Sequence, residues 1–264
     1  MPFRHPGSIA RPDVLVCAGL DPSGGAGLIA DTRVLHDLGA RPVGIVTALT
    51  VQNTTGVVEW HASDPEVIGH QLAFLMTDIE VKAVKIGMIG SPAIARAIAS
   101  ALHLTNAPVV WDPVAGPSLG SVAYADSFDD VVTALRPHLA LVTPNIGELA
   151  LLSRMPIDSL ADAEAAAKHL AHQLDCAVLV KSGHLVGPEA VDLLITASSR
   201  EEFHGTRIAN GERVHGTGCA LSSAIAAYLA AGRALPDACR EAKAYVAERI
   251  AHPVSPGRGA PSVI

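Results

Sequence analysis

The stretch that organises the chain is residues 214–232, VHGTGCALSSAIAAYLAAG. Its alanine-rich part has high helix propensity, and Gly232 stands where such a helix would end. The glycine-rich turn before it leaves backbone N–H groups at the helix start without partners, and these donors together with the helix dipole suit an anion. The run is apolar almost all round, which indicates a buried helix. The stretch therefore predicts either an anion site or an ordinary glycine turn that opens a core helix.

Outward from this stretch, short apolar runs alternate with segments of helical periodicity. Strands are expected at residues 14–19, 43–50, 83–88, 109–112, 139–143 and 177–181, helices at 28–38, 65–76, 92–102, 128–135, 146–152, 160–174 and 236–250, and a late antiparallel pair at 191–196 and 202–209. This alternation predicts an α/β fold with a mostly parallel sheet and helices on both faces. Continuous apolar composition of the strands agrees with burial on both faces.

The domain organisation predicted from the sequence is a single unit over residues 1–264. A chain of 264 residues suits one large α/β domain, and no repeat, low-complexity linker or shift in composition divides it. The proline- and glycine-rich ends, residues 1–13 and 253–264, are expected to be flexible.

Composition excludes several classes of function. The formal net charge is −7 and no basic stripe stands out, which argues against a nucleic-acid partner. No stretch is apolar enough to span a membrane, and the first residues lack the apolar core of a signal peptide. The four cysteines show no CxxC spacing, which indicates unpaired thiols and a cytoplasmic protein.

Chemistry is expected where the parallel strands end, because ligands of open α/β sheets bind at that edge. The polar residues at these ends are Asp21 with its SGGAG loop, Gln52, Asp112, Thr143, Asn145 and Lys181, with Glu148 one turn further on. Carboxylates, a lysine and a helix N-terminus together suit Mg²⁺ binding and phosphoryl transfer. Neither a Walker A motif nor a GxGxxG fingerprint occurs, which argues against a P-loop enzyme or a dinucleotide oxidoreductase.

Each of these residues also has a structural interpretation. Asn145 and Glu148 have the spacing of a capping box. Asp112 precedes a proline and can simply end a strand, and Lys181 can be a solvated strand end. Gln52 in a polar loop is typical of a surface residue, and Met88 is typical of the core.

Taken together, the motifs resemble the hydroxymethylpyrimidine/phosphomethylpyrimidine kinases of the ribokinase-like superfamily. The resemblance runs nearly end to end and is carried by AGLDPSGGAG at 18–27, VTALTVQNT at 46–54, KIGMIG at 85–90, DPV at 112–114, TPN with Glu148 at 143–148, VKSGH at 180–184 and HGTGC at 215–219. It implies a three-layer αβα ribokinase-like fold. It also implies phosphorylation of 4-amino-5-hydroxymethyl-2-methylpyrimidine and then of its monophosphate, with ATP as co-substrate and Mg²⁺, by a homodimer.

The resemblance further implies roles for individual residues. The pyrimidine pocket would be lined by Gly19, Asp31, Gln52, Met88 and Val114. Mg²⁺ would be organised by Asp112 and Glu148, and ATP would be bound by Thr143, Asn145 and Lys181. The anion hole would be formed by Gly216, Thr217, Gly218 and Cys219, which would be catalytic together with Lys181.

Cys219 stands where sugar kinases of the superfamily have an aspartate base. A thiol at a helix N-terminus can have a depressed pKa, so a thiolate base is physically possible. In a loose phosphoryl transition state, however, such a base contributes little.

Two other functions stay open from sequence alone. A pyridoxal or pyridoxine kinase would bind a similar six-membered nitrogen ring bearing CH₂OH, and a non-catalytic module could sense the pyrimidine. The run at 115–121 departs from the family pattern, which leaves open whether both phosphorylation steps occur.

Overall fold

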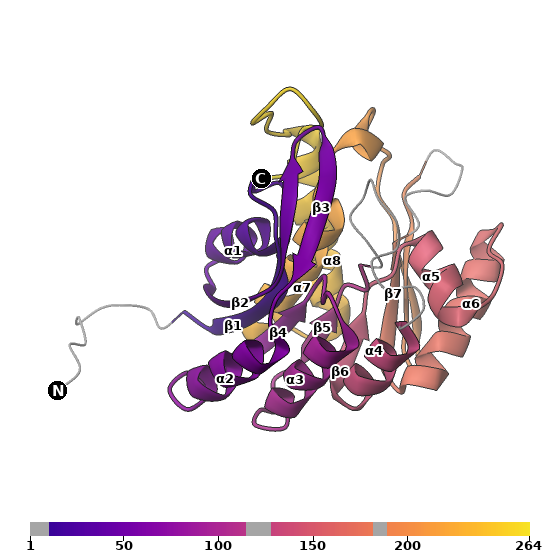
Figure 1. Ribbon diagram of the computed structural model, residues 1–264. Helices are drawn as coiled ribbons and strands as arrows, with labels where there is room; N and C mark the ends of the chain where they lie inside the picture. The colour runs from indigo at the N-terminus through magenta and orange to yellow at the C-terminus, as the bar shows by residue number, and fades with distance from the viewer. Residues whose placement is uncertain (1–10, 115–127, 182–188) are drawn as a thin grey trace.

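A computed structural model describes residues 11–114, 128–181 and 189–264 (Figure 1). The strands are β1 (Asp13–Leu20), β2 (Arg41–Asn53), β3 (Gly56–Ala62), β4 (Val81–Ile86), β5 (Val109–Trp111), β6 (Leu139–Val142), β7 (Ala177–Lys181), β8 (Asp192–Ile195) and β9 (Arg200–Phe203). The helices are α1 (Gly27–Asp37), α2 (Pro65–Met76), α3 (Pro92–Leu102), α4 (Phe128–Leu135), α5 (Ile146–Ser153), α6 (Leu160–Leu174), α7 (Thr217–Ala230) and α8 (Leu235–Ala251).

The described strands form one sheet in the order β3-β2-β1-β4-β5-β6-β7-β8-β9. The strands β2, β1, β4, β5, β6 and β7 run parallel to one another, whereas β3 pairs with β2, β8 with β7 and β9 with β8 in antiparallel fashion. This arrangement confirms the mostly parallel sheet and the late antiparallel pair.

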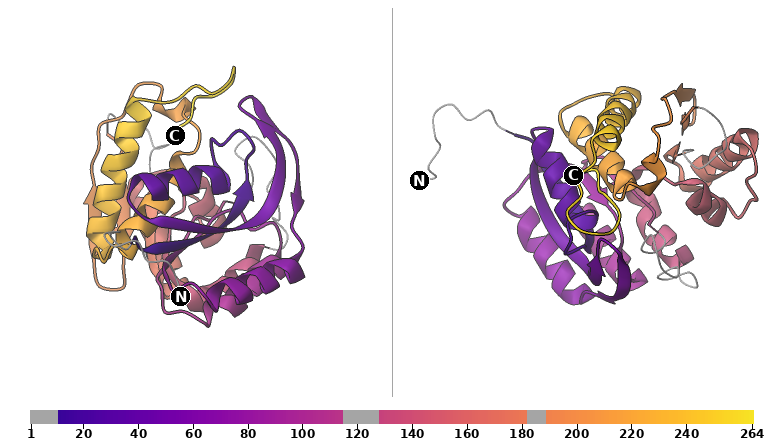
Figure 2. Two further views of the ribbon diagram at one scale, coloured as in Figure 1. Left: turned by 90° about the vertical axis from the view of Figure 1, so that its left-hand side faces the viewer. Right: turned by 90° about the horizontal axis from the view of Figure 1, so that it is seen from above.

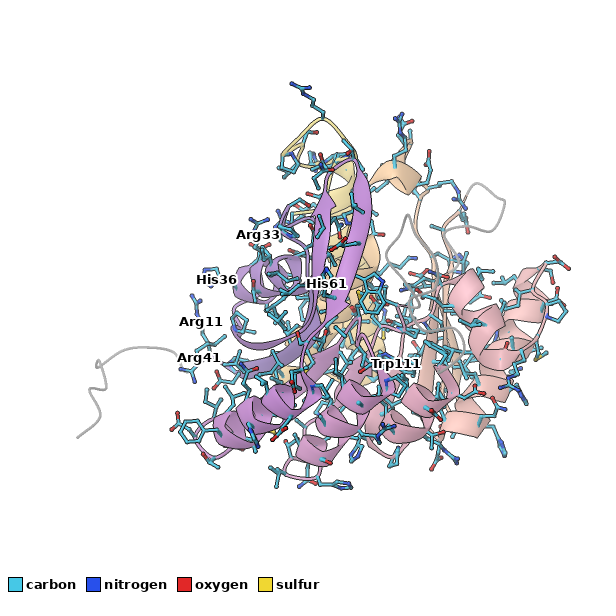
Figure 3. All side chains as sticks on the ribbon, viewed as in Figure 1. Arg11, Arg33, His36, Arg41, His61 and Trp111 are labelled. Carbon is cyan, nitrogen blue, oxygen red and sulfur yellow. The ribbon has the colours of Figure 1, made fainter. Side chains whose placement is uncertain are left out.

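Helices cover both faces of the sheet, which makes three layers. One buried cluster packs α2, α3, α4 and α6 against one face, and a second cluster packs α1, α7 and α8 against the other. Figure 2 shows α8 and α2 on opposite sides of the strands. In Figure 3 Trp111, whose side chain is fully buried, lies within the interior, while His36 and Arg41 lie at the outside. The αβα fold expected from the sequence is therefore confirmed.

Local sequence explains where several helices begin. The Asp64 side chain accepts hydrogen bonds from the backbone N–H groups of Glu66 and Val67, and Pro65 occupies the first turn of α2. The hydroxyl of Ser91 caps α3 in the same way. Helix α7 differs, because its N-cap is Gly216 and no described side chain caps it.

The strand β3 is the main element that the sequence analysis did not predict. Asn53 ends β2 in a tight turn, where its Oδ1 accepts hydrogen bonds from the backbone N–H and the hydroxyl of Thr55. The chain then returns antiparallel to β2 and forms the edge of the sheet. At the other edge, β9 ends at Phe203 rather than extending to 209.

The C-terminal strap, residues 254–263, lies in the part of the chain predicted to be a flexible end, and its backbone is hydrogen-bonded to two other segments. The backbone N–H of Ala260 donates to the carbonyl of Thr54, and the N–H of His215 donates to the carbonyl of Pro261. Val263 is buried against the cluster that contains α7. The strap therefore joins the β2–β3 turn to the start of α7. The other predicted flexible end, 1–13, lies mostly outside the described residues.

Candidate active site

A cavity of about 1050 Å³ lies where the parallel strands end. Its wall includes the carboxyl ends of β1, β2, β4, β5 and β7 and the first turn of α7. The predicted site residues that line it are Gly19, Gln52, Met88, Asp112, Val114, Asn145, Glu148, Lys181, Gly216, Thr217, Gly218 and Cys219. The structure thus brings together most of a site that spans two hundred residues of sequence.

The backbone at the start of α7 packs directly against the backbone of the glycine-rich loop after β1. Gly216 has a φ of 83°, in the left-handed region, and a Cβ atom there would lie 2.0 Å from the carbonyl oxygen of Gly25. Only glycine fits such an approach. Because no described side chain caps this helix end, its first N–H groups remain available to an anion in the cavity.

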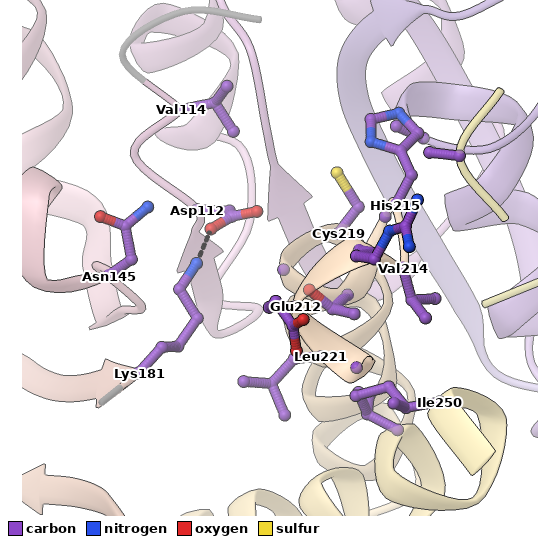
Figure 4. A pocket seen from close by; sticks show the side chains of 18 of the residues that line it. Asp112, Val114, Asn145, Lys181, Glu212, Val214, His215, Cys219, Leu221 and Ile250 are labelled. Atoms are coloured by element: carbon purple, nitrogen blue, oxygen red, sulfur yellow. Dashed lines mark hydrogen bonds and ion pairs between the residues drawn. The ribbon is translucent and has the colours of Figure 1, made fainter. Parts of the chain in front are cut away.

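Lys181 stands opposite this helix start. Its Nζ donates to Asp112 Oδ1 over 2.7 Å and lies 3.7 Å from Glu148 Oε2 (Figure 4). The position of a Cβ atom on Gly218 would be 3.1 Å from the same Nζ. Burial opposes the charge on Lys181, but the Asp112 and Glu148 carboxylates outweigh it and raise the pKa of the ammonium. Lys181 is therefore a permanent cation beside the N-terminus of α7.

Asn145 and Glu148 form the capping box of α5 that their spacing predicts. The Asn145 side chain accepts from the Glu148 N–H over 2.9 Å, and Glu148 Oε2 accepts from the Asn145 N–H over 2.8 Å. The same Glu148 carboxylate faces Lys181, and burial raises its pKa although Lys181 opposes the rise. The structural interpretation of this motif is confirmed, and both residues also line the cavity.

The glycine-rich loop after β1 is organised by Asp21. Its Oδ1 accepts from the N–H and hydroxyl of Ser23, and its Oδ2 accepts from the N–H of Ala26. Burial works against ionisation, but the nearby His215 and the hydrogen bonds from Ser23 and Ala26 hold the pKa of Asp21 below its usual value. This carboxylate therefore fixes the loop that contacts α7.

Gln52 lies in the cavity wall and not on the outer surface. The end of its side chain lies 3.2 Å from Thr50 Oγ1 on one side and 3.4 Å from His215 Nε2 on the other. His215 Nε2 is also 3.7 Å from Asp21 Oδ2. His215 was part of the motif at the start of α7, but its contact with Gln52 could not be predicted from either segment alone.

Asp31 does not line the cavity as expected. It is fully buried, where its Oδ2 accepts from Lys85 Nζ over 2.6 Å and its Oδ1 accepts from the Ser223 hydroxyl over 2.8 Å. Lys85 is itself fully buried but reaches the cavity wall. The physical reason for the correction is that a lysine inside an apolar strand needs an anionic partner, and Asp31 supplies it.

The state of this buried pair follows from its surroundings. Burial lowers the pKa of Lys85, but the nearby Asp31 carboxylate outweighs that effect and raises it overall. Burial also raises the pKa of Asp31, and Lys85 opposes that rise. The proton between them therefore stays on the lysine. The apolar run Val84-Lys85-Ile86 was the signal that could have revealed Lys85.

Thr143 is the other predicted residue that stands behind the cavity. It is fully buried, and its hydroxyl donates to Asp112 Oδ1 over 3.3 Å. Asp112 thus accepts hydrogen bonds from both Thr143 and Lys181, and Thr143 orients the Asp112 carboxylate from behind the cavity.

Cys219 has an environment that disfavours a thiolate. Its sulfur accepts a hydrogen bond from the Gly27 backbone and lies near the Lys85 charge, and both lower its pKa. Burial has the larger effect and raises the pKa of the thiol to about 11. Burial therefore opposes the thiolate that a helix N-terminus would favour.

In the parts of the chain that the structure describes, no group of three or more His, Cys, Asp or Glu side chains converges as a metal cage would require. Among the described helices none is long and apolar enough to cross a membrane. The run at 115–121, which departs from the family pattern, lies outside the described residues.

The fold and this site define a small-molecule kinase of the ribokinase-like class. The family model described as phosphomethylpyrimidine kinase matches residues 21–263. The chain belongs to this family. It is 39% identical to the hydroxymethylpyrimidine/phosphomethylpyrimidine kinase of Mycobacterium tuberculosis, over 98% of this chain and 96% of that protein. Its identity to the enzyme of that name from Streptomyces coelicolor is 38%, over 90% and 88% of the two chains.

Solved structures agree with this assignment. The crystal structure of phosphomethylpyrimidine kinase from Clostridium difficile is 32% identical, with a TM-score of 0.76 over 91% of this chain and all of that one. Pyridoxal kinase from Staphylococcus aureus in complex with AMP-PCP is 26% identical, with a TM-score of 0.87 over 96% and 93% of the two chains.

Proposed function

We propose that this chain transfers the γ-phosphoryl group of ATP to the hydroxymethyl group of 4-amino-5-hydroxymethyl-2-methylpyrimidine, and then a second phosphoryl group to the monophosphate, in thiamine biosynthesis. The observation that carries the proposal is the approach of Lys181 and Asp112 to the first turn of α7 across one cavity. A cation facing free helix N–H groups can hold a phosphoryl group that carries charge in transit.

The two ends of the cavity have different tasks in this proposal. The first turn of α7 and Lys181 bind the transferred phosphoryl group and neutralise its charge. Gln52 forms hydrogen bonds with the edge of the heterocycle. Gly19 has no side chain, so the ring can lie close to β1. Met88 supports this wall, since its sulfur lies 3.3 Å from the position of a Cβ atom on Gly19.

The carboxylates at the phosphate end fit a magnesium ion. Asp112 and Glu148 offer oxygen ligands, and Mg²⁺ in kinase sites uses one or two carboxylates together with water and substrate phosphates. When bound, the ion would neutralise phosphate charge. Thr143 orients Asp112, and the Asn145 N–H orients Glu148. Asn145 itself lines the cavity beside Lys181, where ATP is proposed to bind.

Cys219 acts in this proposal as a backbone donor and not as a base. Its thiol keeps its proton at neutral pH because burial raises its pKa to about 11. The substrate hydroxyl therefore loses its proton late in the transfer, to an oxygen of the transferred phosphoryl group, when the bond to phosphorus is largely formed.

The test is an ATP-consumption assay with the pyrimidine alcohol and pyridoxal side by side, in which mono- and diphosphate are separated by chromatography. We expect the pyrimidine diphosphate to accumulate and chelation of Mg²⁺ to stop turnover. Pyridoxal kinase is the second candidate, because the Staphylococcus aureus enzyme has the higher TM-score, 0.87 against 0.76. Binding of the pyrimidine without ADP formation would instead identify a sensing module.

We also propose that the protein acts in the cytoplasm as a homodimer. Four free thiols support the compartment. The β2–β3 hairpin supports the dimer, because it forms a sheet edge on which Leu49, Val51 and Val58 are exposed. Light scattering coupled to gel filtration measures the mass, and Val51→Glu should yield monomers.

A further inference from the structure

The side chains of Gln52, His215 and Asp21 form a polar cluster in the cavity, and Figure 4 draws His215 across the cavity from Lys181. A glutamine amide can turn by 180° about its last bond, with its oxygen and nitrogen exchanging places. Two hydrogen-bond networks are therefore compatible with the positions of Gln52. In the structure Oε1 of Gln52 lies on the Thr50 side and its Nε2 on the His215 side, and the alternative network exchanges these two atoms.

The Thr50 side decides in favour of one network. The Thr50 hydroxyl carries a single proton, and its oxygen lies 2.9 Å from the carbonyl oxygen of Leu20 and 3.2 Å from the Gln52 amide. A carbonyl oxygen can only accept, so the proton lies on the shorter contact to Leu20. Thr50 Oγ1 is then an acceptor towards Gln52. The NH₂ group of Gln52 must therefore face Thr50, and its oxygen must face His215.

The His215 side leads to the same network independently. Asp21, only 3% exposed and held by three hydrogen bonds from its own loop, lies 3.7 Å from His215 Nε2. A carboxylate at that distance favours a proton on Nε2 over a lone pair. An Nε2–H can donate to an amide oxygen but cannot accept from an NH₂ group. With the Gln52 oxygen towards His215, each contact joins a donor to an acceptor. In the other network two acceptors meet at Thr50 and two donors meet at His215.

We propose that His215 is a positioning residue for substrate recognition, and that its Nε2–H sets the amide of Gln52 so that one N–H faces the heterocycle. Gln52 thereby offers a donor to a ring nitrogen, which can only accept. The preferred ligand is a heteroaromatic ring with an unprotonated nitrogen at the Gln52 edge. This inference rests on the proposed function for the identity of the substrate, but the hydrogen-bond network belongs to the free protein.

The network is tested first without substrate. Long-range ¹H–¹⁵N correlation spectra at pH 8.5 report which ring nitrogens carry protons, and the signals of His215 among the 12 histidines are assigned by their loss in His215→Gln. We expect a proton on Nε2. An unprotonated Nε2 with a proton only on Nδ1 would overturn the proposal. Because no turnover is measured, this result is independent of whether the pyrimidine is the substrate.

The consequence for recognition is tested by kinetics. His215→Leu removes the donor, whereas His215→Gln retains an N–H of similar reach. We expect KM for the pyrimidine alcohol to rise about tenfold in His215→Leu, as for one lost hydrogen bond, with KM for ATP unchanged and most of the affinity recovered in His215→Gln. Thermal unfolding confirms that each variant is folded.

A double-mutant cycle separates this role from a general effect on the cavity. In the Gln52→Ala background, His215→Leu should raise KM less than twofold, because the group it orients is already absent. Equal effects of His215→Leu in both backgrounds would contradict the proposal. If the wild-type protein does not phosphorylate the pyrimidine at all, the proposed function fails while the spectroscopic test stands.

Discussion

The carbonyl oxygen of Gly25 lies 2.0 Å from the point where a Cβ atom on Gly216 would stand. The loop organised by Asp21 therefore rests directly on the backbone at the start of α7. A side chain at residue 216 would separate the two segments. The anion site depends on this contact, since it fixes the direction of the helix N–H groups.

Gly216→Ala should abolish most of the activity. It combines the left-handed φ of 83° with a clash against Gly25, so the loop and helix must move apart. Loss of one aligned donor typically lowers kcat by about 10²–10³. Gly232→Ala is the matched control, because Gly232 has a φ of 84° but nothing within 4 Å of its Cβ position. It should cost about 1 kcal/mol in stability and leave kcat unchanged. Comparable losses of kcat in both variants would contradict this account.

Lys181→Ala should lower kcat severely, by about 10²-fold or more, since it removes the cation that faces the phosphoryl group. Cys219→Ser should lower kcat less than about tenfold, because a hydroxyl keeps the small side chain and the backbone donors. Lys168→Ala is the control, as that lysine forms an exposed ion pair with Glu164. Steady-state kinetics of the three variants decide the matter, and equal losses for Lys181→Ala and Cys219→Ser would refute the division of roles.

The pH dependence of Cys219 gives a separate test. Burial raises the pKa of its thiol to about 11, so the thiolate fraction increases tenfold per unit as pH rises and is about 10⁻³ at pH 8. Alkylation of Cys219 by iodoacetamide, followed by mass spectrometry, should accelerate up to pH 10 without levelling off. The pH profile of kcat should keep its shape in Cys219→Ser. If the alkylation rate levelled off near pH 8 instead, the thiol would ionise easily enough for Cys219 to act as a thiolate base.

The buried pair of Lys85 and Asp31 should be critical for stability. Lys85→Met leaves the Asp31 carboxylate buried without its partner, which destabilises the fold by about 3–5 kcal/mol. Adding Asp31→Leu should recover much of that loss, since neither charge then remains. Lys82→Met on the same strand is the control, because Lys82 pairs with Glu80 on the surface and should contribute less than about 1 kcal/mol. Denaturant unfolding measures all three, and a Lys85→Met protein as stable as the Lys82→Met protein would be incompatible with an ionised pair.

The sequence allowed the layers and most of the phosphate end to be predicted, because both depend on local signals. Buried strands such as 139–143 are continuous apolar runs, and Asp112 and Lys181 follow strands whose ends must meet at one edge of a parallel sheet. The edge strand β3 (Gly56–Ala62) could have been predicted, because apolar Val58, Trp60 and Ala62 alternate with polar residues after a turn.

Pairings between distant segments were beyond such reasoning. Asp31 meets Lys85 across 54 residues, and neither segment contains a signal for the other. The resemblance implied that Asp31 lines the pocket. Asp31 instead lies fully buried behind the cavity wall, because it forms an ion pair with the buried Lys85. The packed C-terminal strap escaped prediction for the same reason, since its proline- and glycine-rich composition is also typical of flexible ends.

The C-terminal strap has a consequence for biosynthesis. The Gly259 N–H donates to the Thr54 hydroxyl across 205 residues of chain, and Gln52 meets His215 across 163. Such contacts form late, because the long loops between them must close first. On the ribosome, the β1–α1–β2 unit can assemble early, but the wall of the pocket is not complete until Pro261 has left the exit tunnel. Substrate or ATP can therefore stabilise the finished protein by binding, but cannot guide the nascent chain.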